Sequence, residues 1–355
     1  MPLALSDPNL LCNRLYINGR WIHPKHCEAL EVRNPATGSI VTSVPNGQRS
    51  DAQAGIQAAV NALPEWSARP AKDRSMFLRQ WHDLVVANVD DLAQILTAEQ
   101  GKPINEARGE ILFGAAFFEW FAEEAKRIYG ETIPAPNTDQ RLVVLKQPIG
   151  VCSAITPWNF PMAMIARKAA PALAAGCTMV LKPASATPLS ALALAELADR
   201  AKIPPGVFNV IPGLASEVGD ELVTNPEVRK VTFTGSTEVG SELMAKAAGT
   251  IKKVSLELGG NAPLLIFNDA DLPSAVEGAV ASKFRNMGQT CVCTNRIYAQ
   301  SGIYEEFVAA FGEAVSQLTV GDGNNEDVQQ GPLIDEDAVC KTEEHLHDAI
   351  ALGAK

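Results

Sequence analysis

Apolar residues in the first part of the chain recur at steps of three and four, the spacing that places them on one helix face. The spacing predicts helices over about 50–64, 71–99 and 104–129, with the short connection 101–103 (Gly-Lys-Pro) between the last two. Before these helices, Leu15–Ile22 alternates apolar and polar residues around Asn18-Gly19. An Asn-Gly pair flanked by alternating residues predicts a β-hairpin with a tight turn.

Short runs of consecutive apolar residues alternate with helical segments from residue 151 to about 249. The first connecting helix is expected to begin near Pro161 and to end before Gly176. Pro171 should kink or split it, because proline removes a helical hydrogen bond. Buried strands separated by helices form mostly parallel sheets covered on both faces, so we predict a doubly wound, Rossmann-like α/β domain. Its strands are expected over 151–156, 178–182, 207–211 and 230–234.

A second α/β unit is expected to begin within 252–260. Residues 131–148 fall outside the alternation and contain the extended run Arg141–Lys146, which we interpret as an arm that reaches a neighbouring subunit. The second unit should contain strands over 264–267 and 295–300 and helices over 272–287 and 304–318. The predicted organisation is a first domain over 1–130 and 149–256, the arm over 131–148, and a second domain over 257–355.

Composition narrows the class of protein. The chain has 355 residues and a formal net charge of −11, which disfavours nucleic acid or an anionic membrane surface as a partner. The opening residues lack the charged flank and apolar run of a secretory signal, and no apolar stretch is long enough to span a bilayer. Seven scattered cysteines do not suggest a disulfide framework, so a reducing compartment, most simply the cytoplasm, is expected.

Four short segments contain residue types suited to catalysis or ligand binding: TPWNFP at 156–161, LKPA at 181–184, LELGGN at 256–261 and GQTCVC at 288–293. Each has an ordinary structural explanation when taken alone. Asn159 is suited to cap the helix that follows it, and Lys182 to end a strand in solvent. Glu257 is typical of a surface residue before a glycine turn, and Cys291 of a small packed side chain.

The order and spacing of these segments resemble the signature blocks of the aldehyde dehydrogenase family, of which LELGG and the GQ-x-C block are the most diagnostic. The similarity continues through KPASATPLSALALAELA, FTGSTEVG and KFRNMGQTCVCTNR and covers nearly all 355 residues. It is strongest to the succinate-semialdehyde branch. The resemblance implies an NAD(P)-binding domain over 1–130 and 149–256, an oligomerisation arm over 131–148 and a catalytic domain over 257–355. The implied reaction is oxidation of succinate semialdehyde to succinate, with no metal.

The resemblance assigns three catalytic roles that the chemistry supports. Cys291 matches the nucleophile, because a thiolate adds readily to an aldehyde and the thioester that forms is easily hydrolysed. The side-chain amide of Asn159 and the backbone N–H of Cys291 match the two donors that stabilise the oxyanion of the adduct. Glu257 matches the general base, and its neighbours Leu256 and Leu258 suggest the burial that would make its carboxylate a better base.

The cofactor assignment also follows from the resemblance. Lys182 matches the residue that holds the adenosine ribose. Relatives that prefer NAD often have a glutamate where this chain has Ser185, so no carboxylate repels a 2′-phosphate here. We expect NADP to be preferred and leave NAD open. The amides after Gly235-Ser236 can receive a phosphate oxygen at a helix N-terminus. The expected cofactor-binding residues are Thr156, Pro157, Trp158, Lys182, Ser185, Gly235 and Ser236.

Two arginines match the residues that hold the distal carboxylate of the substrate in this branch. Arg167 lies eight residues after Asn159, about two helical turns, so both should project from one face. Arg285 lies six residues before Cys291 on the expected helix. Paired guanidinium groups suit a carboxylate because they donate in a planar, bidentate manner. Glutarate semialdehyde, one methylene longer, is the alternative substrate, and an uncharged or cationic aldehyde is disfavoured.

Three further expectations follow from the resemblance. Cys293, in its C-V-C spacing with Cys291, is a redox partner or a packed residue, and the strain of so small a ring favours packing. The family pattern continues past Lys355, so we expect the chain to stop before the family's C-terminal end, with an incomplete catalytic domain. A homo-oligomer, dimer or tetramer, is expected where that end is present. The rival interpretation is a non-catalytic cofactor-binding protein.

Overall fold

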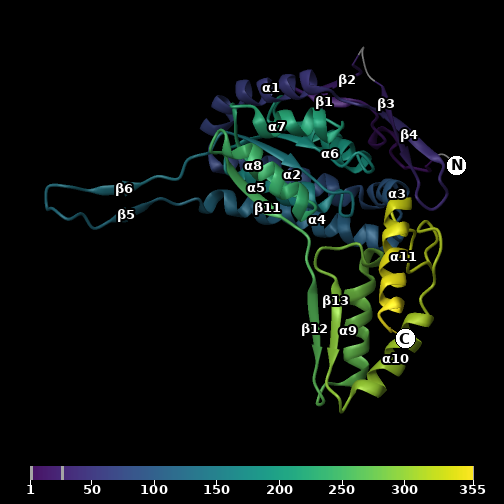
Figure 1. Cartoon of the computed structure of the whole chain (residues 1–355). Helices are drawn as coiled ribbons and strands as arrows, with labels where there is room; N and C mark the ends of the chain where they lie inside the picture. Colours follow the sequence, from purple (N-terminus) through teal and green to yellow (C-terminus); the bar gives the residue numbers. More distant parts are fainter. Residues whose placement is uncertain (1–2, 25–27, 355) are drawn as a thin grey trace.

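A seven-stranded sheet forms the centre of the larger of two units in the computed structural model, which describes residues 3–24 and 28–354 (Figure 1). The strand order is β11-β10-β7-β8-β9-β1-β2. The first five of these strands pair in parallel, whereas β1 runs antiparallel to both β9 and β2. In the same order they span Lys253–Glu257, Val228–Thr234, Val151–Ile155, Thr178–Lys182, Phe208–Val210, Leu15–Ile17 and Arg20–Ile22.

Helices cover both faces of this sheet, so the predicted doubly wound fold is confirmed. One face carries α1 (Arg49–Ala68), α7 (Asp220–Thr224) and α8 (Thr237–Ala248). The other carries α5 (Ala163–Ala174) and α6 (Leu189–Arg200), with a further helical layer packed outside them. That layer consists of α2 (Ala71–Ala87), α3 (Val89–Gln100) and α4 (Ile104–Glu124).

The outer helical layer is joined to the sheet through aromatic packing. Trp81 of α2 is fully buried, and its ring centroid lies 4.2 Å from that of Phe118 on α4 and 5.2 Å from that of Phe208 on β9. Large buried rings contribute much of the apolar area that a core removes from water. The outer layer is therefore part of the same hydrophobic core as the sheet.

Three helix predictions need correction. The first helix passes Pro64 and ends at Ala68, since the buried Trp66 anchors its last turn by donating from Nε1 to the carbonyl of Leu173 at 3.2 Å. The helix expected over 71–99 is divided at Asn88, whose side chain donates to the carbonyl of Leu84 at 2.8 Å and competes with the helical pattern. Pro171 does not split α5, because it lies within the last turn, where few helical bonds remain to be lost.

Three hairpins belong to this unit, and the one at Asn18-Gly19 was predicted from the sequence. Asn18 and Gly19 both have positive φ between β1 and β2, as a tight Asn-Gly turn requires. The segment interpreted as an arm forms the antiparallel hairpin of β5 (Glu131–Ile133) and β6 (Leu142–Val144), which projects away from the sheet (Figure 1). A third hairpin joins β3 and β4. The remaining elements of this unit are β3 (Ala29–Arg33), β4 (Ile40–Pro45) and the short helices η1 (Pro8–Leu10), η2 (Ala125–Arg127) and η3 (Ala215–Gly219).

The second unit is smaller and lies beside the sheet unit (Figure 1). The segment expected to open it, 252–260, instead contains β11, which pairs with β10 and is the edge of the large sheet. Two parallel strands form its own sheet, around a small core of Ile266, Ala279, Ile303 and Phe307. Its elements are β12 (Ala262–Ile266), α9 (Leu272–Phe284), η4 (Arg285–Gly288), β13 (Thr294–Ala299), α10 (Tyr304–Ser316) and α11 (Glu336–Ala351). Among the described residues of both units, no helix is long and apolar enough to cross a membrane.

Candidate active site

The carboxyl ends of four neighbouring parallel strands gather the predicted residues at one edge of the large sheet. Ile155 of β7 is in register with Lys182 at the end of β8, and Thr234 of β10 is in register with Glu257 at the end of β11. Thr156 directly follows β7 and donates its backbone N–H to the carbonyl of Lys182 at 3.1 Å. Open parallel sheets bind their ligands at this edge.

The groups expected to hold the cofactor include buried polar atoms with few protein partners. Lys182 is only 4% exposed, and its Nζ donates to the carbonyl of the adjacent Pro183 at 3.1 Å. Burial lowers the pKa of Lys182 to about 8. The hydroxyl of Thr156 is also buried and has no hydrogen-bond partner among the described residues. Unpaired buried polar groups are costly unless a ligand or water completes them, so these residues fit an anionic, hydroxyl-rich group.

The turn at Gly235-Ser236 has the geometry of a helix start. The hydroxyl of Ser236 accepts from the backbone N–H of Val239 at 3.3 Å and caps α8. Gly235 donates its N–H to the carbonyl of Glu257 at 3.0 Å, and a Cβ on it would lie 2.3 Å from the ring of Phe233. A side chain would not fit there, so the turn depends on glycine.

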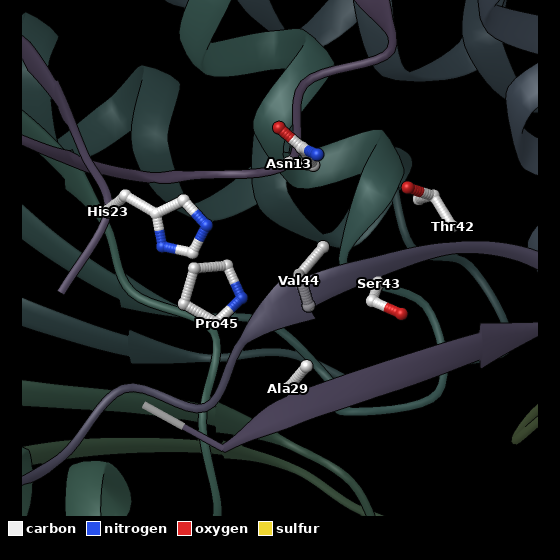
Figure 2. A pocket seen from close by; sticks show the side chains of 7 residues that line it. All are labelled: Asn13, His23, Ala29, Thr42, Ser43, Val44 and Pro45. Carbon is white, nitrogen blue, oxygen red and sulfur yellow. The ribbon is translucent and has the colours of Figure 1, made fainter. Parts of the chain in front are cut away.

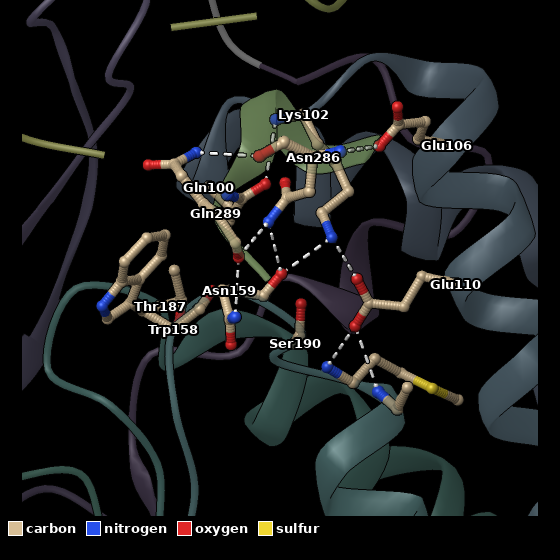
Figure 3. Close-up of polar contacts among 12 residues, drawn as sticks. Gln100, Lys102, Glu106, Glu110, Trp158, Asn159, Thr187, Ser190, Asn286 and Gln289 are labelled. Carbon is tan, nitrogen blue, oxygen red and sulfur yellow. Dashed lines mark hydrogen bonds and ion pairs between the residues drawn. The ribbon is translucent and has the colours of Figure 1, made fainter. Parts of the chain in front are cut away.

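The remaining cofactor candidates lie on the loops after β7 and β8. Ser185 donates its hydroxyl to the carbonyl of Gly213 at 3.2 Å. The carbonyl of Trp158 accepts from the hydroxyl of Thr187 at 3.5 Å (Figure 3). These two hydrogen bonds hold the loops after β7 and β8 in place beside Lys182. Pro157 lies between Thr156 and Trp158 in the same loop.

Asn159 is not on a helix, which corrects the expectation that it shares a helical face with Arg167. It lies in a bend before α5, because Glu110 of α4 accepts from the first backbone N–H groups of that helix and fixes where it begins. The side-chain amide of Asn159 donates to the carbonyl of Gln289 at 2.8 Å (Figure 3). This bond joins the predicted oxyanion donor directly to the loop that carries Cys291.

That nucleophile loop, which we define as residues 285–293, has unusual backbone geometry. Asn286, Met287 and Gly288 have φ values of 51°, 57° and 74°. Two of the three are not glycine, so the left-handed conformation is strained and needs outside support. The helix expected to reach Met287 ends at Phe284 because this reversal cannot continue it. Cys291 is exposed at the end of the turn, as expected of an accessible nucleophile.

The LELGG segment contacts the nucleophile loop through glycine. A Cβ built on Gly260 would lie 2.5 Å from the carbonyl oxygen of Cys291. Asn295, just after the loop, donates its side-chain amide to the carbonyl of Gly260 at 3.2 Å. The structure thus brings the segments of Asn159, Glu257 and Cys291 together.

The expected burial of Glu257 is wrong. Its side chain is 54% exposed, because alternate residues of the edge strand β11 face opposite sides and Leu256 takes the inward position. Its carboxylate lies 3.8 Å from Nη2 of Arg167. One predicted ligand of the substrate carboxylate therefore lies beside the predicted base.

Both substrate arginines are exposed and lie close to aromatic rings. The guanidinium carbon of Arg167 is 5.9 Å from the ring centroid of Phe117, and that of Arg285 is 5.0 Å from the ring centroid of Phe160. Arg285 follows the last residue of α9 instead of lying within the helix. Cation–π contacts of this kind orient a guanidinium group while leaving its N–H donors available.

Cys293 is buried, whereas Cys291 is exposed, and both are free thiols. The Cys293 thiol lies 3.1 Å from the carbonyl of Gly288 and 3.2 Å from the side-chain oxygen of Asn295, in positions to donate to either. These contacts pack it inside the turn. A redox role for the pair stays a prediction.

A polar cluster that was not predicted from the sequence lies behind Asn159; it consists of the buried Lys102, Glu110 and Asn286 and the half-buried Glu106 (Figure 3). One signal was present. Glu110 falls on the buried face of α4, between the buried residues Ala107 and Gly114. A carboxylate in an apolar stripe implies a buried partner.

Other parts of the described structure offer fewer groups for catalysis or metal binding. A surface pocket lined by Asn13, His23, Ala29, Thr42, Ser43, Val44 and Pro45 contains none of the predicted site residues (Figure 2). Within residues 3–24 and 28–354, no group of three or more His, Cys, Asp or Glu side chains is placed to hold a metal ion.

Comparison with known proteins identifies the family of the chain. Residues 21–355 match the aldehyde dehydrogenase family model. A glutarate-semialdehyde dehydrogenase of Pseudomonas aeruginosa is 59% identical over 353 residues, which are 99% of this chain and 73% of the relative. An NADP-dependent succinate-semialdehyde dehydrogenase of Escherichia coli is 60% identical with the same coverage. The crystal structure of an E. coli NADP-dependent enzyme, also 60% identical, superposes with a TM-score of 0.98. The match covers 99% of this chain and 73% of that enzyme.

The contact at Gly260 gives a test of the site's packing. The Gly260→Ala substitution should lower the free energy of unfolding by about 1–3 kcal/mol, since its Cβ meets a backbone atom that cannot move cheaply. The Gly278→Ala substitution on α9, where a Cβ meets nothing within 4 Å, should raise it by about 0.5–1 kcal/mol. Urea denaturation measures both, and equal effects would refute the close contact.

Proposed function

The chain belongs to the aldehyde dehydrogenase family, and from that premise we propose that it oxidises succinate semialdehyde to succinate with NADP. The observation that carries the proposal is the bond from the Asn159 amide to the Gln289 carbonyl, which joins an oxyanion donor to the nucleophile loop. The buried ammonium of Lys182 at the same sheet edge supports the choice of NADP as the cofactor.

The first chemical step forms a bond between the Cys291 sulfur and the aldehyde carbon, and the carbonyl electron pair moves onto oxygen. A side-chain amide has two N–H groups, and one on Asn159 binds Gln289, which leaves the other for this oxyanion. The Cys291 backbone N–H is the second donor. When bound, the nicotinamide supplies an acceptor for the hydride that the adduct expels. The product of this step is a thioester on Cys291.

The second step hydrolyses the thioester. Glu257 removes a proton from water, the water oxygen bonds to the acyl carbon, and the C–S bond breaks with its electron pair returning to sulfur. The exposed carboxylate of Glu257 is accessible to water, and its Oε1 lies 3.8 Å from Nη2 of Arg167. Cys291 regains its thiol or thiolate form, and the carboxylate product leaves.

The residues around Lys182 fit NADP. Lys182 ends β8 and Ser185 lies on the loop that follows, where the ammonium and the hydroxyl can hold the adenosine ribose and its 2′-phosphate. Thr156, with its unpartnered buried hydroxyl, and Pro157 and Trp158 lie on the neighbouring loop. Gly235 and Ser236 start α8, whose N–H groups suit a phosphate oxygen. NAD stays as the second cofactor.

The substrate is a small aldehyde with a distal carboxylate. Arg167 and Arg285 are both exposed, so their donors are available to such a group. Glutarate semialdehyde is the second candidate, because a relative that is 59% identical is a glutarate-semialdehyde dehydrogenase. One methylene changes binding energy by only about 1–3 kcal/mol in most sites.

A stopped-flow measurement of NADPH formation with succinate semialdehyde tests the proposed reaction. We expect a burst in the unmodified protein and none in the Cys291→Ala variant, because hydride leaves only from the cysteine adduct. Arg167→Met and Arg285→Met should each raise KM for succinate semialdehyde about 10- to 100-fold, the loss of charged hydrogen bonds. Their KM for butanal, which has the same chain length without the carboxylate, should change little.

Two outcomes would contradict the proposal. NADP binding without any burst would leave the non-catalytic cofactor-binding interpretation. A burst with equal KM increases for butanal and succinate semialdehyde would remove the arginines as carboxylate ligands.

NADP binding should depend on pH through Lys182. Its pKa in the folded protein is lowered to about 8, so the ammonium is present below that pH and is lost as pH rises through it. The dissociation constant should therefore rise with pH above 8, by at most about tenfold per pH unit. Fluorescence titration between pH 7 and 9.5 measures it. Lys182→Met should bind weakly without this dependence.

Lys168 provides the matched control for the pH experiment. Burial also lowers its pKa to about 8, but its Nζ donates to the hydroxyl of Thr234 at 2.7 Å. The Lys168→Met variant should keep the rise in dissociation constant above pH 8. Loss of the rise in this variant, with the rise kept in Lys182→Met, would reverse the assignment.

We also propose that the β5–β6 arm packs against another copy of the chain, in a dimer or tetramer. A run of exposed apolar side chains supports it, comprising Ile133, Leu142, Val143, Val144 and Leu145. Sedimentation velocity should show a smaller assembly for Val143→Lys/Leu145→Lys than for the unmodified protein. Ile251→Lys, at an exposed residue outside the arm, should not change it. A monomer in all three samples would contradict the proposal.

A further inference from the structure

An ion pair that no step of the reaction uses lies behind the active site. Lys102 and Glu110 are bonded from Nζ to Oε2 at 2.6 Å, and each side chain is about 1% exposed. Two charges removed from water cost more than a surface pair, so a buried pair needs further bonds to be stable. Glu110 has them, since its other oxygen accepts from the backbone N–H groups of Met162 and Ala163 at 3.0 and 3.1 Å.

The second hydrogen bond of the Lys102 ammonium goes to the loop that carries Asn159. Its Nζ donates to the main-chain carbonyl of Asn159 at 2.8 Å (Figure 3). The same carbonyl accepts from the side-chain amide of Asn286 at 3.1 Å. One oxygen of Asn159 thus receives donors from both units, while the side-chain amide of the same residue reaches Gln289 in the nucleophile loop.

The nucleophile loop is held by the same cluster. Asn286, in its left-handed conformation, donates its backbone N–H to Glu106 at 2.8 Å. Lys102 and Arg285 lie 4.1 and 5.0 Å from the ring centroid of Phe160, the residue after Asn159. These contacts stabilise a strained turn that would otherwise relax.

The connection that carries Lys102 is itself clamped by the second unit. Ile104 donates its N–H to the carbonyl of Gly323 at 2.8 Å. Cβ atoms built on Gly323 and Gly331 would lie 2.6 Å from the carbonyl of Lys102 and 2.1 Å from that of Gly101. The lysine is therefore fixed at its backbone as well as at its ammonium.

We propose that Lys102 is a positioning residue for the reaction. Its ammonium, anchored on Glu110, fixes the main chain of Asn159 and thereby sets both the oxyanion donor and, through Asn286, the loop that presents Cys291. The catalytic part of this proposal rests on the proposed function, whereas the structural part does not.

A double-mutant cycle on the rate of hydride transfer tests it. Asn159→Ala removes the oxyanion donor and should slow the step about 100- to 1000-fold. Lys102→Met should slow it at least tenfold, with KM and NADP affinity little changed. In the Asn159→Ala background, Lys102→Met should have a clearly smaller further effect, because the side-chain amide is gone and only the effect on the nucleophile loop remains. Equal factors in both backgrounds would mean a general structural lesion and would overturn the proposal.

Hydrogen exchange of the nucleophile loop supplies a readout that needs no activity. Exchange across 285–293 should be faster in Lys102→Met. The Lys102→Met/Glu110→Gln variant should behave in the same way, while avoiding an unpaired buried charge and retaining an acceptor for α5. Unchanged exchange in both variants would overturn the proposal. This test does not need activity, so it can be read even where the unmodified protein transfers no hydride and the proposed function has failed.

Glu99 provides the matched control. It is buried like Glu110 and accepts from the backbone N–H groups of Leu189 and Ser190 at 2.7 and 2.8 Å, so it caps α6 as Glu110 caps α5. Within the part of the chain that the structure describes, its side chain hydrogen-bonds Leu189 and Ser190 and neither Asn159 nor the nucleophile loop. Glu99→Gln should leave both the hydride-transfer rate and the exchange of 285–293 unchanged. Faster loop exchange in this variant would contradict a specific role for Lys102.

Discussion

Two buried carboxylates decide where the helices that follow the functional loops begin. Glu110 accepts from the first N–H groups of α5, and Glu99 does the same for α6. Those N–H groups have no partner within their helices, so a carboxyl oxygen that accepts from them satisfies donors that would otherwise be buried unpaired. The loop of Asn159 ends at one of these starts and the loop of Lys182 at the other. The outer helical layer therefore positions the catalytic and the cofactor segments through two hydrogen-bonded anchors.

The parallel sheet supplies the second constraint. Its register puts the ends of β7, β8, β10 and β11 at one edge, so residues distant in sequence become neighbours without any special contact between them. The second unit is then joined to that edge by backbone contacts, chiefly at Gly260 and at the connection before α4. Such contacts tolerate no side chain, which explains why small residues recur where the units meet.

The sequence predicted those features that depend on local pattern or on the family motifs. Apolar runs located the strands of the sheet, and the Asn-Gly pair located the first hairpin. The four motifs predicted the segments that the structure brings together. The sequence did not reveal the partner of Lys102, because a lysine between glycine and proline has the appearance of a solvated turn, and Glu110 becomes its partner only through packing. Burial of Glu257 was predicted from neighbours in sequence, whereas strand alternation places those neighbours on the other face.

Asn159 and Glu257 differ in how firmly their surroundings hold them, and the difference suits the roles proposed for them. Asn159 is fixed by three hydrogen bonds, so the proposed oxyanion donor is already oriented without any ligand. Glu257 lies on an edge strand, exposed, with Arg167 at 3.8 Å. Adduct formation needs a donor that does not move, because reorienting it would add to the barrier. The proposed base therefore keeps contact with solvent, whereas the proposed oxyanion donor is held by hydrogen bonds to both units.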